Sequence, residues 1–86
     1  MKKLVEEVSG EGLETLMGEQ VILFCMNYFY TGKLTGVNTD DVILKDPSIV
    51  YETGSFSDSK YADAQQMHLD ELYVRTNSIE SYGKSK

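Results

Sequence analysis

The periodicity of hydrophobic and polar residues changes near residue 20 of the chain. In the first eighteen residues apolar side chains recur three or four apart, as at Leu13 and Leu16, with glutamates between them. This is the spacing of apolar residues on one face of a helix. Serine and glycine at residues 9–12 interrupt it. We therefore expect a frayed helical start and a short helix over residues 12–17. Gly18 is expected to end that helix, because glycine suits the left-handed conformation of a C-terminal cap.

From residue 20 onward the pattern is that of β-strands joined by short turns. The first apolar run shows no alternation, as expected of a strand that is covered on both faces. Asn27 suits a tight turn, and Pro47 is expected to end the third strand because proline cannot donate a hydrogen bond to a neighbouring strand. The predicted strands cover residues 20–26, 29–36, 42–45, 65–76 and 79–82, with an extended arm at 49–53 after the third.

Glycines inside the second strand indicate the fold class. Gly32 and Gly36 permit sharp bending or the close approach of two backbones, which strands that curl into a barrel require. We expect a mainly β protein in which a short N-terminal helix precedes a five-stranded, strongly bent open β-barrel of the SH3-like or OB type. The expected parts are a frayed helical segment at 1–12, one barrel domain at 13–82 with a variable loop at 54–63, and a mobile tail at 83–86.

A chain of 86 residues makes one small domain, whose core alone confers little stability. The single cysteine, Cys25, cannot form an internal disulfide, and its place in an apolar run predicts a buried side chain. The sequence has no cluster of Cys and His that would bind a stabilising metal, so we expect neither a metal nor a cofactor. Association with further copies of the chain is the natural remaining source of stability.

Charge limits the partners that the whole surface can attract. Fourteen acidic and eight basic residues give a net charge of −6, so binding to nucleic acid would require a local patch. The longest apolar run, residues 21–26, is far shorter than the roughly 20 residues that cross a bilayer. The chain also starts without the apolar stretch of a signal peptide. We expect a soluble, cytoplasmic protein that does not bind a membrane.

Catalysis is not predicted. His68 has no neighbour that would complete a catalytic motif. The adjacent pairs Asp40-Asp41 and Asp70-Glu71 would point to opposite faces of a strand, so neither forms a two-carboxylate site. No serine–histidine–aspartate order and no glycine-rich phosphate loop is present. We therefore expect a protein that is not an enzyme.

The aromatic run Tyr28, Phe29 and Tyr30 leaves two interpretations open. Exposed aromatic rings can stack on the bases of single-stranded nucleic acid, which contributes about 1–3 kcal/mol per base. Alternatively, the rings pack into the barrel or against a neighbouring subunit, which is the ordinary role of aromatics beside an apolar hairpin.

Three segments together resemble the Sm-like (LSm) protein family. Residues 13–23, LETLMGEQVIL, are similar to the family's passage from a helix into the first strand, with the pattern Leu-x-x-Leu-x-Gly-x-x-Val. Residues 30–38, YTGKLTGVN, are similar to the first Sm motif, and residues 72–79, LYVRTNSI, to the second. The segments occur in the family's order, and the resemblance covers residues 13–82.

The resemblance implies a homo-oligomeric ring of six to eight subunits, in which strands of neighbouring copies pair. It also implies binding of uridine-rich single-stranded RNA near the pore, with a role in RNA metabolism as a non-enzymatic scaffold or chaperone. The positions that match the RNA-binding turns are Asn38, Asp40, Asp41, Arg75, Thr76 and Asn77. The positions on strands expected to pair between subunits are Leu72, Tyr73, Val74, Ile79 and Tyr82.

Departures from the family pattern predict weak RNA binding. Asn38 stands where the motif has aspartate, and Thr76 stands where it has glycine. No amide occupies the position that reads the base, at or next to Asp41-Val42. Arg75 could instead pair with an acidic residue across the subunit interface. Two other functions remain open: an Sm-like ring that assembles with proteins and does not bind RNA, and a monomeric SH3-like module with a peptide groove.

Overall fold

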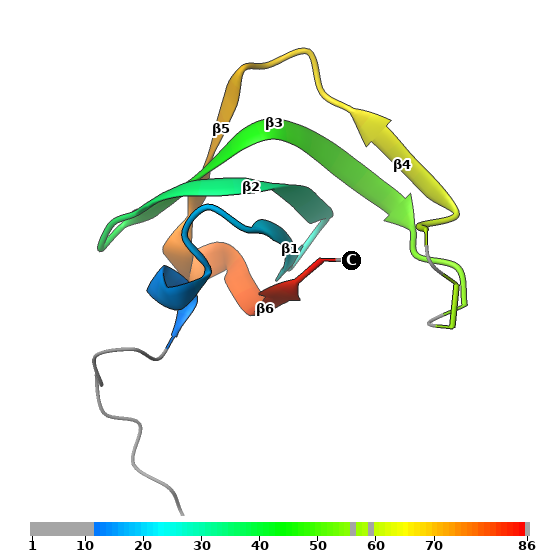
Figure 1. Ribbon diagram of the computed structural model, residues 1–86, viewed down its shortest axis with the longest axis horizontal. Helices are drawn as coiled ribbons and strands as arrows, with labels where there is room; N and C mark the ends of the chain where they lie inside the picture. The colour runs from blue at the N-terminus through cyan, green and yellow to red at the C-terminus, as the bar shows by residue number, and fades with distance from the viewer. Residues whose placement is uncertain (1–11, 56, 59, 86) are drawn as a thin grey trace, which may run out of the picture.

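Two short 3-10 helical turns and six strands build the described part of the fold. The computed structural model describes residues 12–55, 57, 58 and 60–85 (Figure 1). In chain order the elements are the 3-10 helix η1 (Leu13–Leu16), strands β1 (Gln20–Cys25), β2 (Phe29–Val37), β3 (Asp41–Glu52), β4 (Asp63–Gln66) and β5 (Glu71–Arg75), the 3-10 helix η2 (Thr76–Ser78) and strand β6 (Ile79–Lys84). Figure 1 shows β2 and β3 arching over β1, with η1 and β6 beneath the arch.

The six strands form one antiparallel sheet that curls on itself without closing. The order is β4-β3-β2-β1-β6, and β5 also pairs with β3. Strand β5 uses residues 41–45 of β3, whereas β4 uses residues 48–52. Within the described part of the chain no ladder joins β4 or β5 to β6, so both outer edges are open. The prediction of a mainly β, strongly bent sheet is confirmed.

The α-helix predicted over residues 12–17 is wrong. The structure has only η1, a single 3-10 turn of four residues. Gly12 and Gly18 on either side of it have φ angles of 86° and 84°, in the left-handed region that interrupts a right-handed helix. The Gly18 amide donates to the Leu34 carbonyl at 2.7 Å, which turns the chain directly into β1. The frayed helical segment predicted before it falls mainly at residues 1–11, which lie outside the described residues.

The prediction that Pro47 ends the third strand is also wrong. Strand β3 continues through it to Glu52, because Asp46 takes a φ of 49° and forms a bulge with the buried Pro47. The register with β2 accordingly jumps from Lys33↔Lys45 to Thr31↔Ser48, so no ladder donor is needed from the proline.

The predicted fourth strand, residues 65–76, is divided at the same bulge. The Asp46 amide donates to the Asp70 carbonyl at 3.0 Å, and the Met67 amide donates to the Pro47 carbonyl at 2.9 Å. These bonds hold residues 67–70 outside the ladder, which separates β4 from β5. The sheet therefore has six strands in place of the five expected.

The core lies inside the curl of the sheet. Its buried members are Val21, Leu23, Cys25, Leu34, Val42, Leu44 and Val74. Leu13 and Leu16 of η1 pack against one side of this cluster, and Cys25 is buried as expected. Gly32 explains how β2 comes so close to β3, because a Cβ there would lie 2.9 Å from the Leu44 Cβ and 3.1 Å from the Lys45 carbonyl oxygen.

The last strand is longer than predicted, and the tail is correspondingly shorter. Strand β6 runs to Lys84, because Gly83 pairs with Ile22 and Lys84 with Val21 of β1. The Ser85 amide then donates to the Gln20 carbonyl at 2.8 Å. Placing residues 83–85 in a mobile tail was therefore wrong. No helix in the described part of the chain is long and apolar enough to cross a membrane.

Candidate nucleic-acid interface

Two polar turns meet at one end of the sheet. The first connects β2 to β3 at residues 38–40, and the second is η2, which follows β5. They meet because Asp41 at the start of β3 is the register partner of Arg75 at the end of β5. The Asn38 amide donates to the Asp41 carbonyl at 2.8 Å and closes the first turn. The Thr76 amide donates to the Asp40 carbonyl at 2.8 Å and ties the second turn to the first.

A shallow depression of about 180 Å³ lies between the two turns. It is lined by Thr39, Asp40, Arg75, Thr76 and Asn77. Four of the six residues predicted to bind RNA therefore surround one hollow, although they come from segments about 35 residues apart in the chain. Asp41 does not line the hollow but forms the ion pair with Arg75, and Asn38 contributes its backbone amide to the turn. We name these turns and the hollow the turn site.

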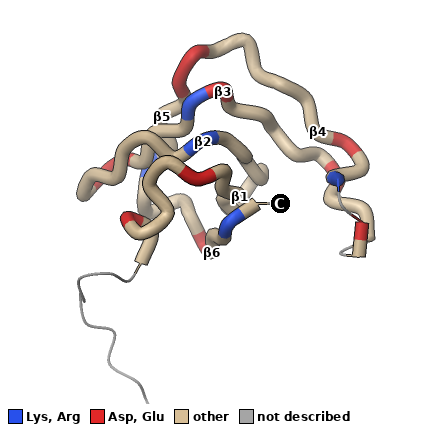
Figure 2. Tube along the Cα trace, in the orientation of Figure 1, with Lys and Arg blue, Asp and Glu red and all other residues tan. Residues whose placement is uncertain are grey.

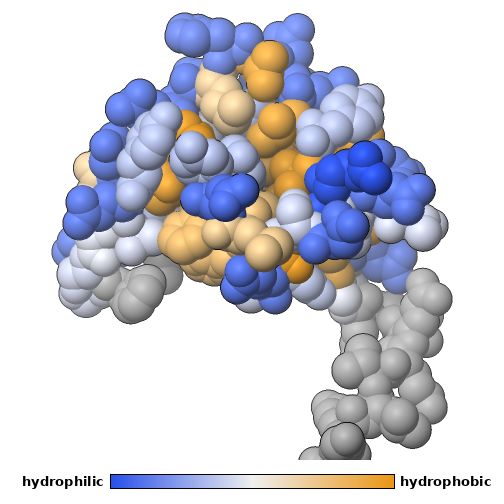
Figure 3. Space-filling model, turned by 180° about the vertical axis from the view of Figure 1, so that it is seen from behind, coloured by the Kyte–Doolittle hydropathy of each residue, from blue (hydrophilic) through white to orange (hydrophobic). Residues whose placement is uncertain are grey.

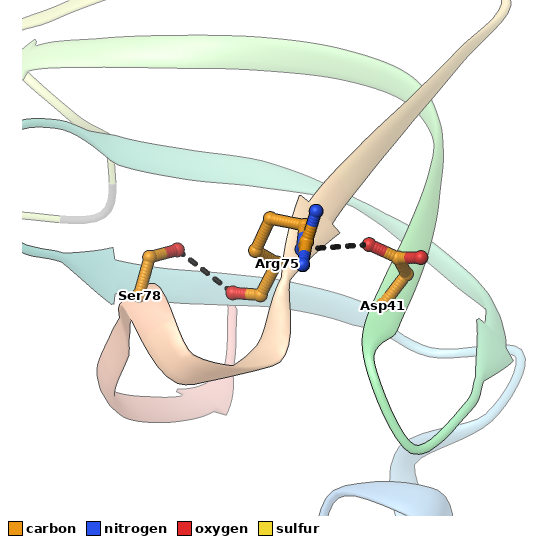
Figure 4. A network of polar contacts seen from close by, with 3 residues as sticks. All are labelled: Asp41, Arg75 and Ser78. Carbon is orange, nitrogen blue, oxygen red and sulfur yellow. Dashed lines mark hydrogen bonds and ion pairs between the residues drawn. The ribbon is translucent and has the colours of Figure 1, made fainter.

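Arg75 is paired within its own chain. Its Nε lies 3.6 Å from Asp41 Oδ1, and Ser78 Oγ donates to the Arg75 carbonyl at 2.7 Å (Figure 4). The Arg75 side chain is 73% exposed, so this ion pair is screened by solvent and contributes only about 0–1 kcal/mol. The guanidinium group thus remains accessible to a ligand, and it has a carboxylate partner without any contact from another subunit.

The residues predicted at the subunit interface separate into two groups. Val74 is 5% exposed and lies in the core of its own chain, and Leu72 and Ile79 pack against that core. The side chain of Val74 points toward Val42 in its own chain, so only its backbone is available for pairing with another copy. Tyr73 and Tyr82 are 60% and 42% exposed on the outermost strands, and both are accessible to a neighbouring copy.

A larger hollow lies elsewhere among the described residues. It measures about 490 Å³ and lies between β1, the end of β6 and the connection that leads from β3 into β4. Ile22 and Phe24 give it an apolar floor, and the Tyr61 hydroxyl lies 2.9 Å from the Ser85 hydroxyl across it. None of the residues predicted to bind RNA lines it, so it is not part of the turn site.

Two other residues considered from the sequence have ordinary surroundings. His68 lies in the connection between β4 and β5, beside Asp46 and Asp70. No group of three or more metal-ligating side chains occurs among the described residues. Phe29 packs edge-on against Phe24, with ring centroids 4.8 Å apart. In the aromatic run of residues 28–30, Phe29 therefore packs within the fold.

Comparison with known proteins identifies the fold. No protein-family model matches the sequence, and no curated protein matches it. Among solved structures it is similar to the Sm protein of Pyrococcus abyssii in complex with a uridine heptamer, with a TM-score of 0.59 at 12% identity. The superposition covers 84% of this chain and 90% of the archaeal chain. The chain has an Sm-like fold. The two segments that resemble the Sm motifs, residues 30–38 and 72–79, lie on β2 and on β5 with η2. The turn site is formed where the turn that follows the first segment meets η2 in the second.

Proposed function

We propose that this protein assembles into a homo-oligomeric ring of six to eight subunits and binds single-stranded RNA at the turn site. It would act in RNA metabolism as a non-enzymatic scaffold or chaperone in the cytoplasm. The observation that carries the proposal is the meeting of Asp40 with Arg75, Thr76 and Asn77 around one hollow, at the positions where the family binds RNA. The Sm protein of similar fold was solved in complex with a uridine heptamer, which makes uridine-rich RNA the first ligand to test.

Ring assembly would cover the open edges of the sheet. An exposed edge offers unpaired backbone groups to another strand, and the outer edges of β5 and β6 are both available in this chain. Pairing β5 of one copy with β6 of the next is a head-to-tail contact, which closes into a ring when the rotation per subunit is suitable. Figure 3 shows apolar side chains at the centre of one face between polar margins, and assembly could bury such area.

Electrostatics set the expected strength of RNA binding. Acidic residues occur at several separate places over the fold (Figure 2), and each copy adds a net charge of −6 to a ring. This charge repels phosphate at long range, whereas one Arg75 per subunit would converge on the pore. Since Asp41 already pairs with that arginine, we expect micromolar or weaker binding, with uridine preferred over adenosine.

Binding of labelled oligouridine at low salt tests the turn site. We expect wild-type protein to bind oligouridine more tightly than oligoadenosine, and Arg75→Ala to abolish this preference. A charge-assisted hydrogen bond contributes roughly 1.5–3 kcal/mol when it is made, so the loss should be at least about tenfold. Lys33→Ala is the matched control, because it removes one exposed positive charge from β2 away from both turns. Equal binding by wild-type and Arg75→Ala proteins would contradict the proposal.

A ring that assembles with proteins and does not bind RNA is the second candidate function. The Asp41–Arg75 ion pair and the acidic surface favour it. Absence of oligouridine binding together with a ring mass in light scattering would support this function over the first. A single species near 9.7 kDa at micromolar concentration would refute both rings.

A further inference from the structure

Three tyrosines gather at the end of the β2–β3 pair that lies opposite the turn site. The rings of Tyr28 and Tyr30 have centroids 6.4 Å apart and are tilted by 55°. Tyr51 follows Val50, the register partner of Phe29, so it lies next to Tyr28 across the two strands. Tyr28 is 49% exposed and Tyr51 is 56% exposed. We name Tyr28, Tyr30 and Tyr51 the tyrosine cluster.

The tyrosine cluster borders a groove. A depression of about 210 Å³ is lined by Asn27, Tyr28, Phe29, Val50 and Tyr51. Its wall is held in place, because Phe29 packs edge-on against Phe24 and Val50 is 3% exposed. Aromatic rings therefore line the groove on a supported surface, and the faces of such rings carry negative electrostatic potential.

The charged residue that follows the lining of the groove on β3 is acidic. None of the residues that line it is Lys or Arg. Glu52 follows Tyr51 and stands directly opposite Asp63 in the β3–β4 register, and both side chains are exposed. Like charges in this arrangement repel each other and destabilise the sheet. On the β6 side, Glu80 is close enough to Cys25 to raise the pKa of its thiol, in addition to the larger effect of burial.

The aromatic groove and the acidic residues beside it favour a positively charged ligand. Phosphate groups of a nucleic acid would approach carboxylates with no basic side chain in the groove, so base stacking there would be opposed by repulsion. A positively charged side chain would be attracted instead. Ring faces attract cations, and a cation would also reduce the repulsion between Glu52 and Asp63. An acidic chain with a net charge of −6 also attracts a basic partner at long range.

We propose that the tyrosine cluster binds a basic segment of a partner protein, with an arginine or lysine side chain held against the rings of Tyr28 and Tyr51. The neighbouring Glu52 and Asp63 would bind a further positive residue of the same segment. This surface is separate from the turn site and does not depend on RNA binding. Its partner is a flexible, positively charged peptide segment.

The test measures binding of a short labelled peptide of alternating arginine and glycine to the full chain. A cation above an exposed ring contributes about 0.5–1 kcal/mol, or roughly two- to fivefold in affinity per ring. Tyr28→Ala combined with Tyr51→Ala should therefore weaken binding about tenfold. Tyr28→Phe should stay within about twofold of wild type, because it keeps the ring. Leu69→Ala, which removes an exposed side chain between β4 and β5, should have no effect, and the same peptide with citrulline for arginine should not bind.

Three results would overturn the proposal. Equal peptide binding by wild-type protein and the double tyrosine variant would show that attraction to the acidic surface alone is measured. Oligoadenosine binding that the double variant loses would make the cluster a base-stacking surface. A smaller mass of the double variant in light scattering would make it a contact between subunits. Urea unfolding of every variant confirms that the fold is intact. Arg75→Ala should bind the arginine peptide like wild type even if it loses oligouridine binding, so a failure at the turn site and a failure at the tyrosine cluster can be told apart.

Discussion

The two ends of the β2–β3 pair carry different chemistry on the same scaffold. Nine residues of β2 separate them, at most about 30 Å along the strand. At one end, backbone hydrogen bonds fix two polar turns around the exposed Arg75. At the other end, the rings of the tyrosine cluster pack beside Phe29, with carboxylates nearby and no basic residue in the groove.

The difference shows how a small acidic domain can separate two kinds of ligand. The main chain holds the turn site, so its side chains can change with little effect on folding. Side-chain packing around Phe29 and Val50 holds the groove, and its selectivity comes from the surrounding charge. Both ends depend on the core between them, where Leu34 and Leu44 face each other fully buried.

Removing the shared core should have the largest effect. Leu44→Ala deletes a fully buried side chain from β3 and should lower the free energy of unfolding by about 2–5 kcal/mol, with loss of binding at both ends. Urea denaturation monitored by circular dichroism measures this change. Leu69→Ala makes the same substitution at a side chain that is 48% exposed, and it should change stability far less. Equal costs at the two positions would contradict the core assigned here.

The bend at Gly32 should be the next most sensitive position. A methyl group there would contact the Leu44 Cβ and the Lys45 carbonyl, which belong to strand β3 and cannot move independently. Gly32→Ala should therefore cost about 1–3 kcal/mol by overpacking. At Gly36 the three atoms nearest to the new methyl group all belong to the Ile43 side chain, and the nearest is its terminal Cδ1 at 2.8 Å, so Gly36→Ala should cost less. The two urea midpoints decide the order, and the reverse order would refute this account of the bend.

Much of this fold was predictable from local sequence signals. The run 20–26, the glycines of β2 and the polar turn before Asp41 each specify a local structure that does not depend on distant contacts. The bulge at Asp46 and Pro47 could not be predicted. Proline ends a strand only where its missing amide faces a partner, and here the jump in register removes that requirement.

The sites were predictable only where local sequence signals determine them. The motif order placed Asp40 and Arg75 in turns, and the structure brings these turns together. The pairing of Arg75 with Asp41 depends on the β3–β5 register, which the sequence does not state. Tyr51 was missed because the third strand was predicted to end before it. The inward direction of Val74 likewise follows from strand parity, which an apolar residue type alone cannot reveal.

Breaking the Asp41–Arg75 pair should sharpen the contrast between the ends. Asp41→Asn removes a carboxylate that competes with RNA phosphate for Arg75, so oligouridine binding should strengthen by up to about fivefold. Stability should change by less than about 1 kcal/mol, since the pair is largely exposed. Arginine peptide binding at the tyrosine cluster should not change. Asp70→Asn makes the same change of charge away from the turn site, and an equal gain there would attribute the effect to net charge alone.

The smallest effect should appear at alkaline pH, and it belongs to the end with the tyrosine cluster. Burial raises the pKa of the Cys25 thiol above 9.0 and that of the Tyr30 phenol above 10.0, and nearby groups raise the Tyr30 value further. The folded state therefore keeps these protons at pH values where the unfolded chain has begun to lose them. Because the folded state then binds more protons than the unfolded state, stability must fall as pH rises above about 8.5.

Urea unfolding at a series of pH values from neutral to alkaline measures this fall. Cys25→Ala combined with Tyr30→Phe removes both titrating groups, so the decline with pH should be shallower in that variant even though its stability at neutral pH is lower. A wild-type free energy of unfolding that rises across the alkaline range would contradict the sign derived above. An equally steep decline in the double variant would mean that groups outside this end of the sheet control alkaline stability.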